Sequence, residues 1–462
     1  MKPSPSRQPS ETPTDVTRRD FLRGSSAATL AALMGGIPII LPSARGADKP
    51  AATQSGTPLK VAVVGCGTWG REILNTLARL PSAEVVAVCD TYAAMLRRAK
   101  EAAPKATGLA DYTQILSDKN IPAVVVATPS HQHKDIVMAA LKAGKHVYCE
   151  APLAHSVEDA RAIAQAAKAA PFQNFQSGLG LRSDPQRKFL LDFLRAGAAG
   201  RAIKGRTQWH NKQSWRRTSP NADREKELNW RLASATSPGL IGEISIHQLD
   251  NLAWYLNGRP TAVTGFGSII HWNDGRDVAD SAQAVYEFPK GALVNCEATL
   301  CNSFDADYEM LFGTDAAVML RGNKAWMFKE VDAPLLGWEV YARKDTFYKE
   351  TGIALVANAT KLAAQGDKPV EDAPFTNTPL YYALEAFVYN TDIVHTAVKD
   401  FVENFGDDDK KALGEALKAA TINNKPAASW ADGFEATVMA LKGNEAVQKK
   451  TRVEIPAALF EV

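Results

Sequence analysis

The sequence is poor in cysteine. Five cysteines are spread over 462 residues, at Cys66, Cys89, Cys149, Cys296 and Cys301. Their spacing shows none of the clustering that is typical of a metal site, and an odd number excludes a framework in which every cysteine is paired within the chain. We therefore expect no metal site, and we expect the cysteines to be free thiols that are mostly buried.

The sequence also lacks an excess of charge of one sign and a long hydrophobic run. Its 53 basic and 51 acidic residues give a formal net charge of +2. This balance provides neither the basic surface of a nucleic-acid-binding protein nor an acidic tail. The apolar run at residues 27–41 is too short for a membrane-spanning helix. We expect no nucleic-acid partner and no stable membrane insertion after processing.

The N-terminal region has the order of features of an export signal. Residues 17–23 read Thr-Arg-Arg-Asp-Phe-Leu-Arg and resemble the twin-arginine motif; the apolar run and small residues at 44–47 follow. We predict a signal peptide at 1–47, a linker at 48–57, and export to the periplasm or otherwise out of the cytoplasm. The alternative is a chance arginine pair before a core helix.

A glycine-rich loop follows the first strongly apolar segment. After residues 59–64 the chain reads Gly65-Cys66-Gly67-Thr68-Trp69-Gly70, and apolar residues then recur at helical spacing. In a dinucleotide site the first glycine allows a tight turn, the second lets the pyrophosphate approach, and the third lets helix and strand pack closely. Unpaired N–H groups at the start of the helix would bind the pyrophosphate. We predict a cofactor site formed by Gly65, Gly67, Thr68, Trp69 and Gly70.

An acidic residue stands where a ribose partner is needed. A second apolar segment, residues 84–88, leads to Asp90, twenty residues after Gly70. Its carboxylate can accept hydrogen bonds from ribose hydroxyls and would repel a 2′-phosphate, so NAD is favoured over NADP. Arg97 and Arg98 lie close enough to weaken that preference.

Strands and helices alternate through the first part of the chain. Apolar strands are expected at 121–129, 144–149 and 172–176, with helices between them. This alternation predicts a doubly wound Rossmann domain at 58–180, with a parallel sheet. Ligands bind at the carboxyl ends of such strands. The residues expected at the cofactor mouth are Thr128, Pro129, His133, Glu150 and Pro152.

The second part of the chain has the pattern of a different sheet. Short alternating segments such as 282–288 and 292–300 predict an open, largely antiparallel sheet. We assign 181–462 to a substrate-binding α+β domain. A helix is expected at 239–257, where Glu243 and His247 are four residues apart and share a face. From this helix alone, a packing histidine is the better interpretation of His247.

The motifs taken in order resemble the Gfo/Idh/MocA family of NAD(P)-dependent sugar enzymes. The likeness runs from about residue 59 to the C-terminus. It is carried by the glycine loop, Ala127-Thr128-Pro129-Ser130 with His133, Gly144-Lys145-His146-Val147, Glu150-x-Pro152, Arg182, Pro185, Asn229-Trp230-Arg231, Gly242-Glu243, His247, Asp250 and the segment 426–433.

The resemblance implies roles for residues of the second domain. His247 would transfer protons, as an imidazole titrating near neutrality can, and Glu243 would orient it. Arg182, Trp230 and Asp250 would bind a small carbohydrate, although Asp250 is also a candidate structural acid. Tyr308 is a further candidate for catalysis, with a core tyrosine as the alternative. The open sheet of this family often forms subunit contacts, so a homo-oligomer is expected.

One departure from the family pattern affects the expected reaction. Dehydrogenases of the family have Glu-Lys-Pro where this chain has Glu150-Ala151-Pro152, and members resembling glycoside hydrolase family 109 also lack the lysine. Free NAD is not replenished outside the cytoplasm, so an exported enzyme needs a bound cofactor that is reduced and reoxidised within one cycle. We expect glycoside hydrolysis through transient oxidation of the sugar. The alternatives are a sugar oxidoreductase and a non-catalytic sugar- or nucleotide-binding protein.

Overall fold

The computed structural model describes residues 55–341, 344–347, 350–355 and 375–462. The predicted signal peptide at 1–47 and most of the linker at 48–57 lie outside this part of the chain. Within it, no helix is long and apolar enough to cross a membrane. The five cysteines are free, and four of them are buried while Cys301 is half-buried.

The first domain is built on a six-stranded parallel sheet in the order β3-β2-β1-β4-β5-β6. Its central strands are short and apolar on both faces, as strands covered by helices on both sides must be. The strands are β1 (Leu59–Val64), β2 (Ala83–Cys89), β3 (Thr107–Leu109), β4 (Ala123–Val126), β5 (His146–Cys149) and β6 (Phe175–Ser177). The helices between them are α3 (Thr68–Leu77), α4 (Ala93–Ala102), α5 (Thr113–Ser117), α6 (His133–Lys142) and α7 (Val157–Lys168).

The second domain has a mixed ten-stranded sheet in which only the β7–β10 pair is parallel among the described strands. The predicted fold class, a Rossmann domain followed by an open, largely antiparallel sheet, is confirmed. The strands are β7 (Ala202–His210), β8 (Ala262–Ser268), β9 (Ser281–Glu287), β10 (Leu293–Thr299), β11 (Asp307–Gly313), β12 (Ala316–Arg321), β13 (Lys324–Lys329), β14 (Lys344–Phe347), β15 (Glu350–Ala354) and β16 (Arg452–Glu454).

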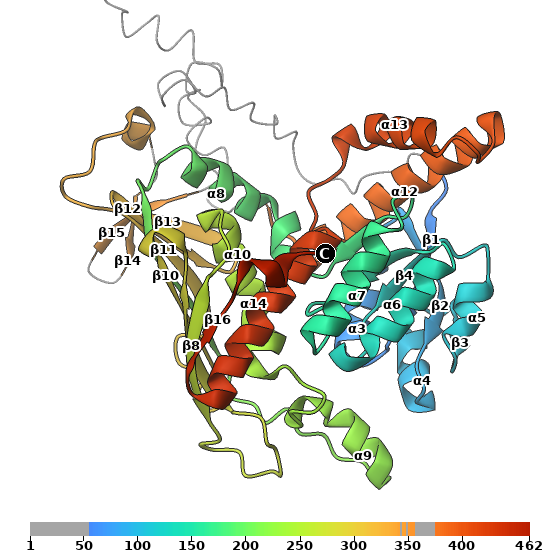
Figure 1. Cartoon of the computed structure of the whole chain (residues 1–462), viewed down its shortest axis with the longest axis horizontal. Helices are drawn as coiled ribbons and strands as arrows, with labels where there is room; N and C mark the ends of the chain where they lie inside the picture. Colours follow the sequence, from blue (N-terminus) through green and yellow to red (C-terminus); the bar gives the residue numbers. More distant parts are fainter. Residues whose placement is uncertain (1–54, 342–343, 348–349, 356–374) are drawn as a thin grey trace, which may run out of the picture.

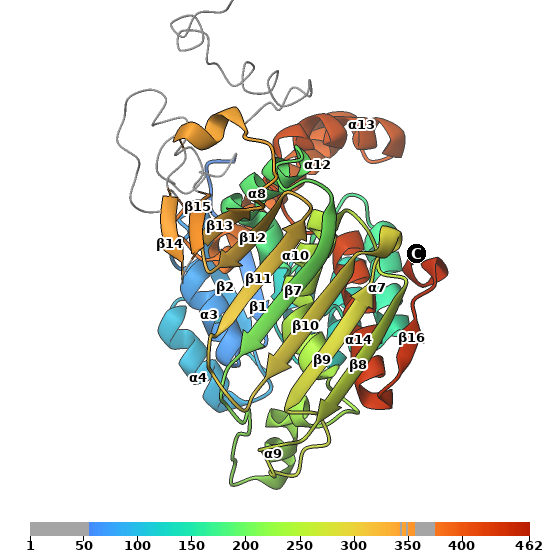
Figure 2. The ribbon, with the colours of Figure 1, turned by 90° about the vertical axis from the view of Figure 1, so that its left-hand side faces the viewer.

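Helices cover one face of the large sheet and join the two domains. They are α8 (Pro185–Arg195), α10 (Ile246–Leu256) and α14 (Trp430–Lys449), and α14 also packs on α7 of the first domain. Figure 2 shows the opposite face of this sheet, where the strands face the viewer. A capping box between Ser429 and Asp432 fixes the start of α14.

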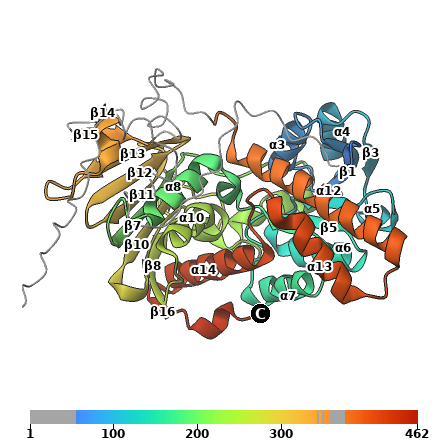
Figure 3. The same cartoon turned by 90° about the horizontal axis from the view of Figure 1, so that it is seen from above.

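Part of the C-terminal half returns to the nucleotide domain. Helix α12 (Pro379–Phe405) lies along α3, and α13 (Lys410–Ala420) packs on α12, as Figure 3 shows from above. Apolar residues at the start of α12 share one core with β1 and α3. The range 181–462 therefore contributes a helix to the first domain as well as forming the second. Neither local periodicity nor composition distinguishes that helix from its neighbours in the sequence.

Candidate active site

A deep cleft lies between the two domains, at the carboxyl ends of β1, β4 and β5. Its volume is about 1860 Å³, which exceeds the roughly 300–1,000 Å³ of a site for one small ligand. The cleft has room for a dinucleotide and a second molecule. Of the predicted cofactor residues, ten line it: Gly65, Gly67, Thr68, Trp69, Gly70, Asp90, Thr128, Pro129, His133 and Glu150.

The glycine loop has the geometry that a pyrophosphate requires. Gly65 has a φ of +94°, and a Cβ there would lie 2.6 Å from the carbonyl carbon of Ala127. A Cβ at Gly70 would collide with the carbonyl oxygen of Gly65. At Gly67 nothing lies within 4 Å of the Cβ position, and no side chain caps α3 there. Open space and uncapped N–H groups therefore meet at one point, where an anionic ligand is favoured.

Asp90 lies at the end of β2 and supports the loop. Its Oδ2 accepts a hydrogen bond of 2.9 Å from the amide of Cys66, and its Oδ1 accepts one of 2.8 Å from the amide of Tyr92. A carboxylate oxygen can accept more than one hydrogen bond, so both oxygens can still receive ribose hydroxyls. Asp90 thus holds the backbone of the loop as well as facing the cleft.

Two loops at the cleft floor are joined by His133. Its Nε2 lies 2.9 Å from the carbonyl oxygen of Thr128 and its Nδ1 lies 3.1 Å from that of Pro152. Burial lowers the pKa of His133. Pro152 itself is not among the residues that line the cleft, so its predicted cofactor role reduces to this carbonyl contact.

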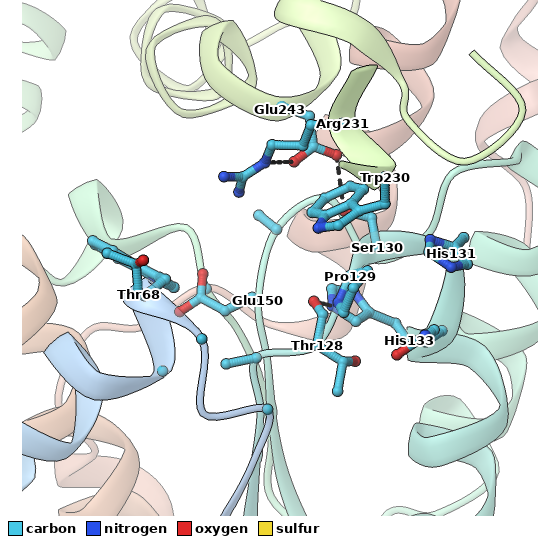
Figure 4. A pocket seen from close by; sticks show the side chains of 18 of the residues that line it. Thr68, Thr128, Pro129, Ser130, His131, His133, Glu150, Trp230, Arg231 and Glu243 are labelled. Atoms are coloured by element: carbon cyan, nitrogen blue, oxygen red, sulfur yellow. Dashed lines mark hydrogen bonds and ion pairs between the residues drawn. The ribbon is translucent and has the colours of Figure 1, made fainter. Parts of the chain in front are cut away.

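Glu150 is a buried acid that lines the cleft (Figure 4). Burial raises the pKa of its carboxyl to about 7, against smaller opposing effects of Trp69, the Ala151 amide and Tyr148. Its Oε1 has no hydrogen-bond partner among the described residues. A Cβ at Gly178 would lie 2.5 Å from Glu150 Oε2, so the glycine leaves room for this carboxyl. Ala151 also lines the cleft and provides no ionisable group.

His247 faces the cleft from the second domain. It lies at the start of α10 and is half-buried. Burial lowers the pKa of its imidazole to about 4, and no hydrogen bond joins the ring to another described residue. The imidazole is therefore neutral at pH 7, and it titrates well below the near-neutral range that its expected role in proton transfer assumed.

Glu243 does not hold His247 in the predicted way. It lies in a π-helical turn, Ile241–Ser245, that precedes α10; such turns are rare and often occur at functional sites. Its Oε1 accepts a hydrogen bond of 2.9 Å from the Ser130 hydroxyl, and its Oε2 accepts one of 3.1 Å from Arg231 Nε. Figure 4 shows this group bridging the two domains at the top of the cleft. Glu243 therefore positions Ser130 and Arg231 rather than the imidazole.

Arg182 and Asp250 form a buried ion pair outside the cleft lining. The guanidinium of Arg182 donates two hydrogen bonds of 2.8 Å to Asp250 and one of 2.6 Å to Asp432. The Asp250 side chain is only 1% exposed. The structure does not bring these two predicted substrate residues to the cleft, and the structural alternative for Asp250 fits its position. Trp230 does line the cleft, as predicted.

Tyr308 is also separated from the site. It lies on β11 between Asp307 and Glu309, which line the cleft. Successive side chains of a strand point to opposite faces, so Tyr308 points to the other face of the sheet. There it packs between the guanidinium groups of Arg206 and Arg321. The catalytic role predicted for Tyr308 is not supported by this position.

Trp215 and Arg224 carried no recognisable signal in the sequence, whereas Trp209 was expected to pack in a strand, with substrate stacking as the alternative. Trp209 and Trp215 line the second-domain side of the cleft. Arg224, from the short helix α9 (Ala222–Leu228), also lines it and stacks on Tyr92, its guanidinium carbon 4.4 Å from the ring centroid. Within the described residues, no group of three or more His, Cys, Asp or Glu is arranged to hold a metal ion.

Comparison with known proteins identifies the family. Residues 59–176 match the model of an oxidoreductase family with an NAD-binding Rossmann fold, and residues 190–322 match the GFO/IDH/MocA C-terminal domain. The two matches come in the order of the two domains and together cover more than half of the chain. The chain belongs to the Gfo/Idh/MocA family. The predicted NAD-binding Rossmann domain is confirmed by this match.

Curated relatives of this family are sugar and polyol enzymes. The chain is 30% identical over 211 residues to levoglucosan dehydrogenase of Pseudarthrobacter phenanthrenivorans, covering 41% of this chain and 52% of the relative. It is 29% identical over 201 residues to inositol 2-dehydrogenase of Salmonella paratyphi B, covering 43% of this chain and 55% of the relative. The matched part thus spans about half the length of these relatives.

Solved structures share the fold over most of the chain. A levoglucosan dehydrogenase in complex with NADH matches with a TM-score of 0.64 and 20% identity, covering 87% of this chain and 100% of that one. A complex of such an enzyme with NADH and levoglucosan matches with a TM-score of 0.63, also at 20% identity and with the same coverage of both chains. At this identity the likeness shows the two-domain fold.

Proposed function

We propose that this protein is an NAD-dependent carbohydrate enzyme whose reaction has no net redox change. It would be exported by the twin-arginine route and would cleave a glycoside by transient oxidation of the sugar ring. NAD bound at the glycine loop would supply a hydride acceptor that becomes the hydride donor later in the same cycle.

The observation that carries this proposal is the unpartnered imidazole of His247 opposite the glycine loop. Burial lowers its pKa to about 4, so the ring is unprotonated at neutral pH and has an open lone pair that would accept a proton. The family lysine is replaced by Ala151, and the titratable side chains of His247 and Glu150 are among those that line the cleft. Glu150, with a pKa of about 7, can exist in either protonation state near neutrality.

The proposed chemistry balances without an external oxidant. Oxidation of a sugar at C3 makes the neighbouring C2–H acidic, and in this proposal His247 would remove that proton. The C1–O bond then breaks and the leaving alcohol takes a proton. Water adds across C1 and C2, and the C3 ketone is reduced again. The net change is a glycoside plus water giving a sugar plus an alcohol.

The contact between Arg224 and Tyr92 supports a retained cofactor. Tyr92 follows Asp90 in the nucleotide domain, whereas Arg224 belongs to α9, which projects below the second domain in Figure 1. Residues of α9 and residues around Asp90 line the same cleft. A dinucleotide bound there would lie beneath this contact, which would slow its release.

Purified protein without added cofactor tests the proposal. The enzyme is incubated with nitrophenyl and methyl glycosides, and the products are analysed. We expect a free sugar and the alcohol, with no net formation of NADH. His247→Gln should lower turnover by about 10²–10⁴-fold, as expected for loss of a general base. His271→Gln, at an exposed histidine outside the cleft, is the matched control. Full turnover by His247→Gln would contradict the assignment.

A sugar dehydrogenase is the second candidate. It is supported by the names of the curated relatives, levoglucosan dehydrogenase and inositol 2-dehydrogenase. This candidate predicts NADH in proportion to product when NAD is supplied, together with an oxidised sugar. The product analysis distinguishes the two because only hydrolysis gives an unoxidised sugar without NADH.

A further inference from the structure

The second-domain side of the cleft carries three tryptophans from separate segments. Trp209 lies at the end of β7, Trp215 lies in the following loop, and Trp230 comes after α9. All three are half-buried, so each ring is anchored on the protein while part of it faces the cleft. With Trp69 from the glycine loop, four tryptophans among the described residues line this one cleft.

Trp215 is held in an unusual backbone conformation. Its φ is +63°, in the left-handed region that bulky residues rarely adopt. Such conformations persist only where the surroundings enforce them, and they cluster at ligand sites. The adjacent Ser214 carbonyl accepts a hydrogen bond from Arg276, whose side chain is 1% exposed and is paired with Asp274. The protein therefore fixes the Trp215 ring at the cleft wall at a cost in local strain.

Arg231 lies between two of these rings. Its guanidinium carbon is 4.9 Å from the Trp230 ring centroid and 5.6 Å from that of Trp215. Its Nε donates to the buried carboxylate of Glu243, and its side chain is 43% exposed. The terminal N–H groups have no hydrogen-bond partner among the described residues, and they can donate to a ligand in the cleft.

This combination suits a sugar ring. One face of a pyranose carries C–H groups that pack on an aromatic plane, and its hydroxyls accept hydrogen bonds from a guanidinium. We propose that Trp215 and Arg231, beside Trp230, form a subsite for a second sugar ring, attached through C1 of the sugar that reacts near His247. The substrate class is then a glycoside with a sugar as its leaving group. This inference rests on the proposed function.

Equilibrium binding to the holoenzyme loaded with NADH, which cannot oxidise the sugar and so leaves the ligand intact, tests the subsite. Maltose, cellobiose and lactose are compared by calorimetry with methyl α-glucoside, methyl β-glucoside and methyl β-galactoside, which keep the non-reducing sugar but lack the second ring. We expect at least one disaccharide to bind the wild type about tenfold more tightly than its methyl partner. Trp215→Ala should remove that advantage while leaving methyl glycoside binding unchanged.

Two variants keep the test specific. Trp215→Phe retains an aromatic plane and should keep most of the preference. Phe304→Ala removes an aromatic ring that is 81% exposed and outside the cleft lining, and should change nothing. The subsite is refuted if no disaccharide is preferred by the wild type, or if Trp215→Ala keeps the preference. If a disaccharide binds more tightly than its methyl glycoside but no glycoside is turned over, the proposed function alone is refuted. If glycosides are turned over but no disaccharide binds more tightly, the subsite alone is refuted.

Discussion

Replacing Arg224 by alanine should release the bound dinucleotide faster. The Arg224 side chain is 17% exposed, its guanidinium carbon lies 4.4 Å above the Tyr92 ring, and its NH1 is paired with Glu227 at 2.8 Å. A partly desolvated cation–π contact contributes about 1–2 kcal/mol. If this contact must open before the cofactor leaves, its loss raises the dissociation rate by about 5- to 30-fold.

The assay mixes protein that holds NADH with an excess of NAD, which is not fluorescent, and follows the decay of the fluorescence of bound NADH. Tyr92→Ala should match Arg224→Ala, and the double variant should add little because the two residues act through one contact. Tyr92→Phe keeps the ring and should behave like the wild type. Arg259→Ala is a matched control, since Arg259 also pairs with a glutamate and stacks on a ring, that of Phe460, outside the cleft. An unchanged dissociation rate in Arg224→Ala would refute the reasoning.

Three further predictions concern groups inside and outside the cleft. Tyr308→Phe should keep wild-type turnover, because the ring packs on the opposite face of the sheet from the cleft; a loss above tenfold in kcat would contradict this placement. Arg182→Ala should lower the free energy of unfolding by about 3–5 kcal/mol, because it leaves the Asp250 carboxyl buried without its partner. Denaturant unfolding measures this loss, and a loss below about 1 kcal/mol would contradict the prediction. Glu150→Gln should stabilise the cofactor-free protein at high pH. Folding raises the pKa of Glu150 from 4.5 to about 7. The protonated carboxyl therefore adds to the free energy of unfolding below pH 4.5, and this contribution is lost as pH rises through 7. The difference in free energy of unfolding between the variant and the wild type should be about 3 kcal/mol more favourable to the variant at pH 8.5 than at pH 4.5. An equal difference at the two pH values would exclude the raised pKa as the cause.

The nucleotide site could be predicted from sequence because its determinants are local. Gly65, Gly70 and Asp90 belong to one strand–helix–strand unit, and their spacing alone indicates a dinucleotide site. The alternation of apolar segments likewise predicted the parallel sheet, since strands buried on both faces must be apolar throughout.

The second-domain side of the cleft depends on features that local patterns do not encode. The face of Tyr308 depends on strand register, and a shift of one residue reverses it. The partners of Glu243 depend on a π-helical turn and on Ser130, which is 113 positions away in the sequence. Arg224 and Tyr92 belong to different domains, so their contact depends on how the two domains pack together. These contacts join segments that are distant in sequence, and no motif marks them.

Hydrogen exchange at the sugar tests the central claim most directly. Purified enzyme without added cofactor is incubated with a glycoside in D₂O, and the released sugar is analysed by mass spectrometry and NMR. The account predicts one deuterium at C2 of the product and no net NADH, because His247 would remove that proton while the hydride from C3 is returned. A product without deuterium at C2, or NADH formed in proportion to product, would contradict it.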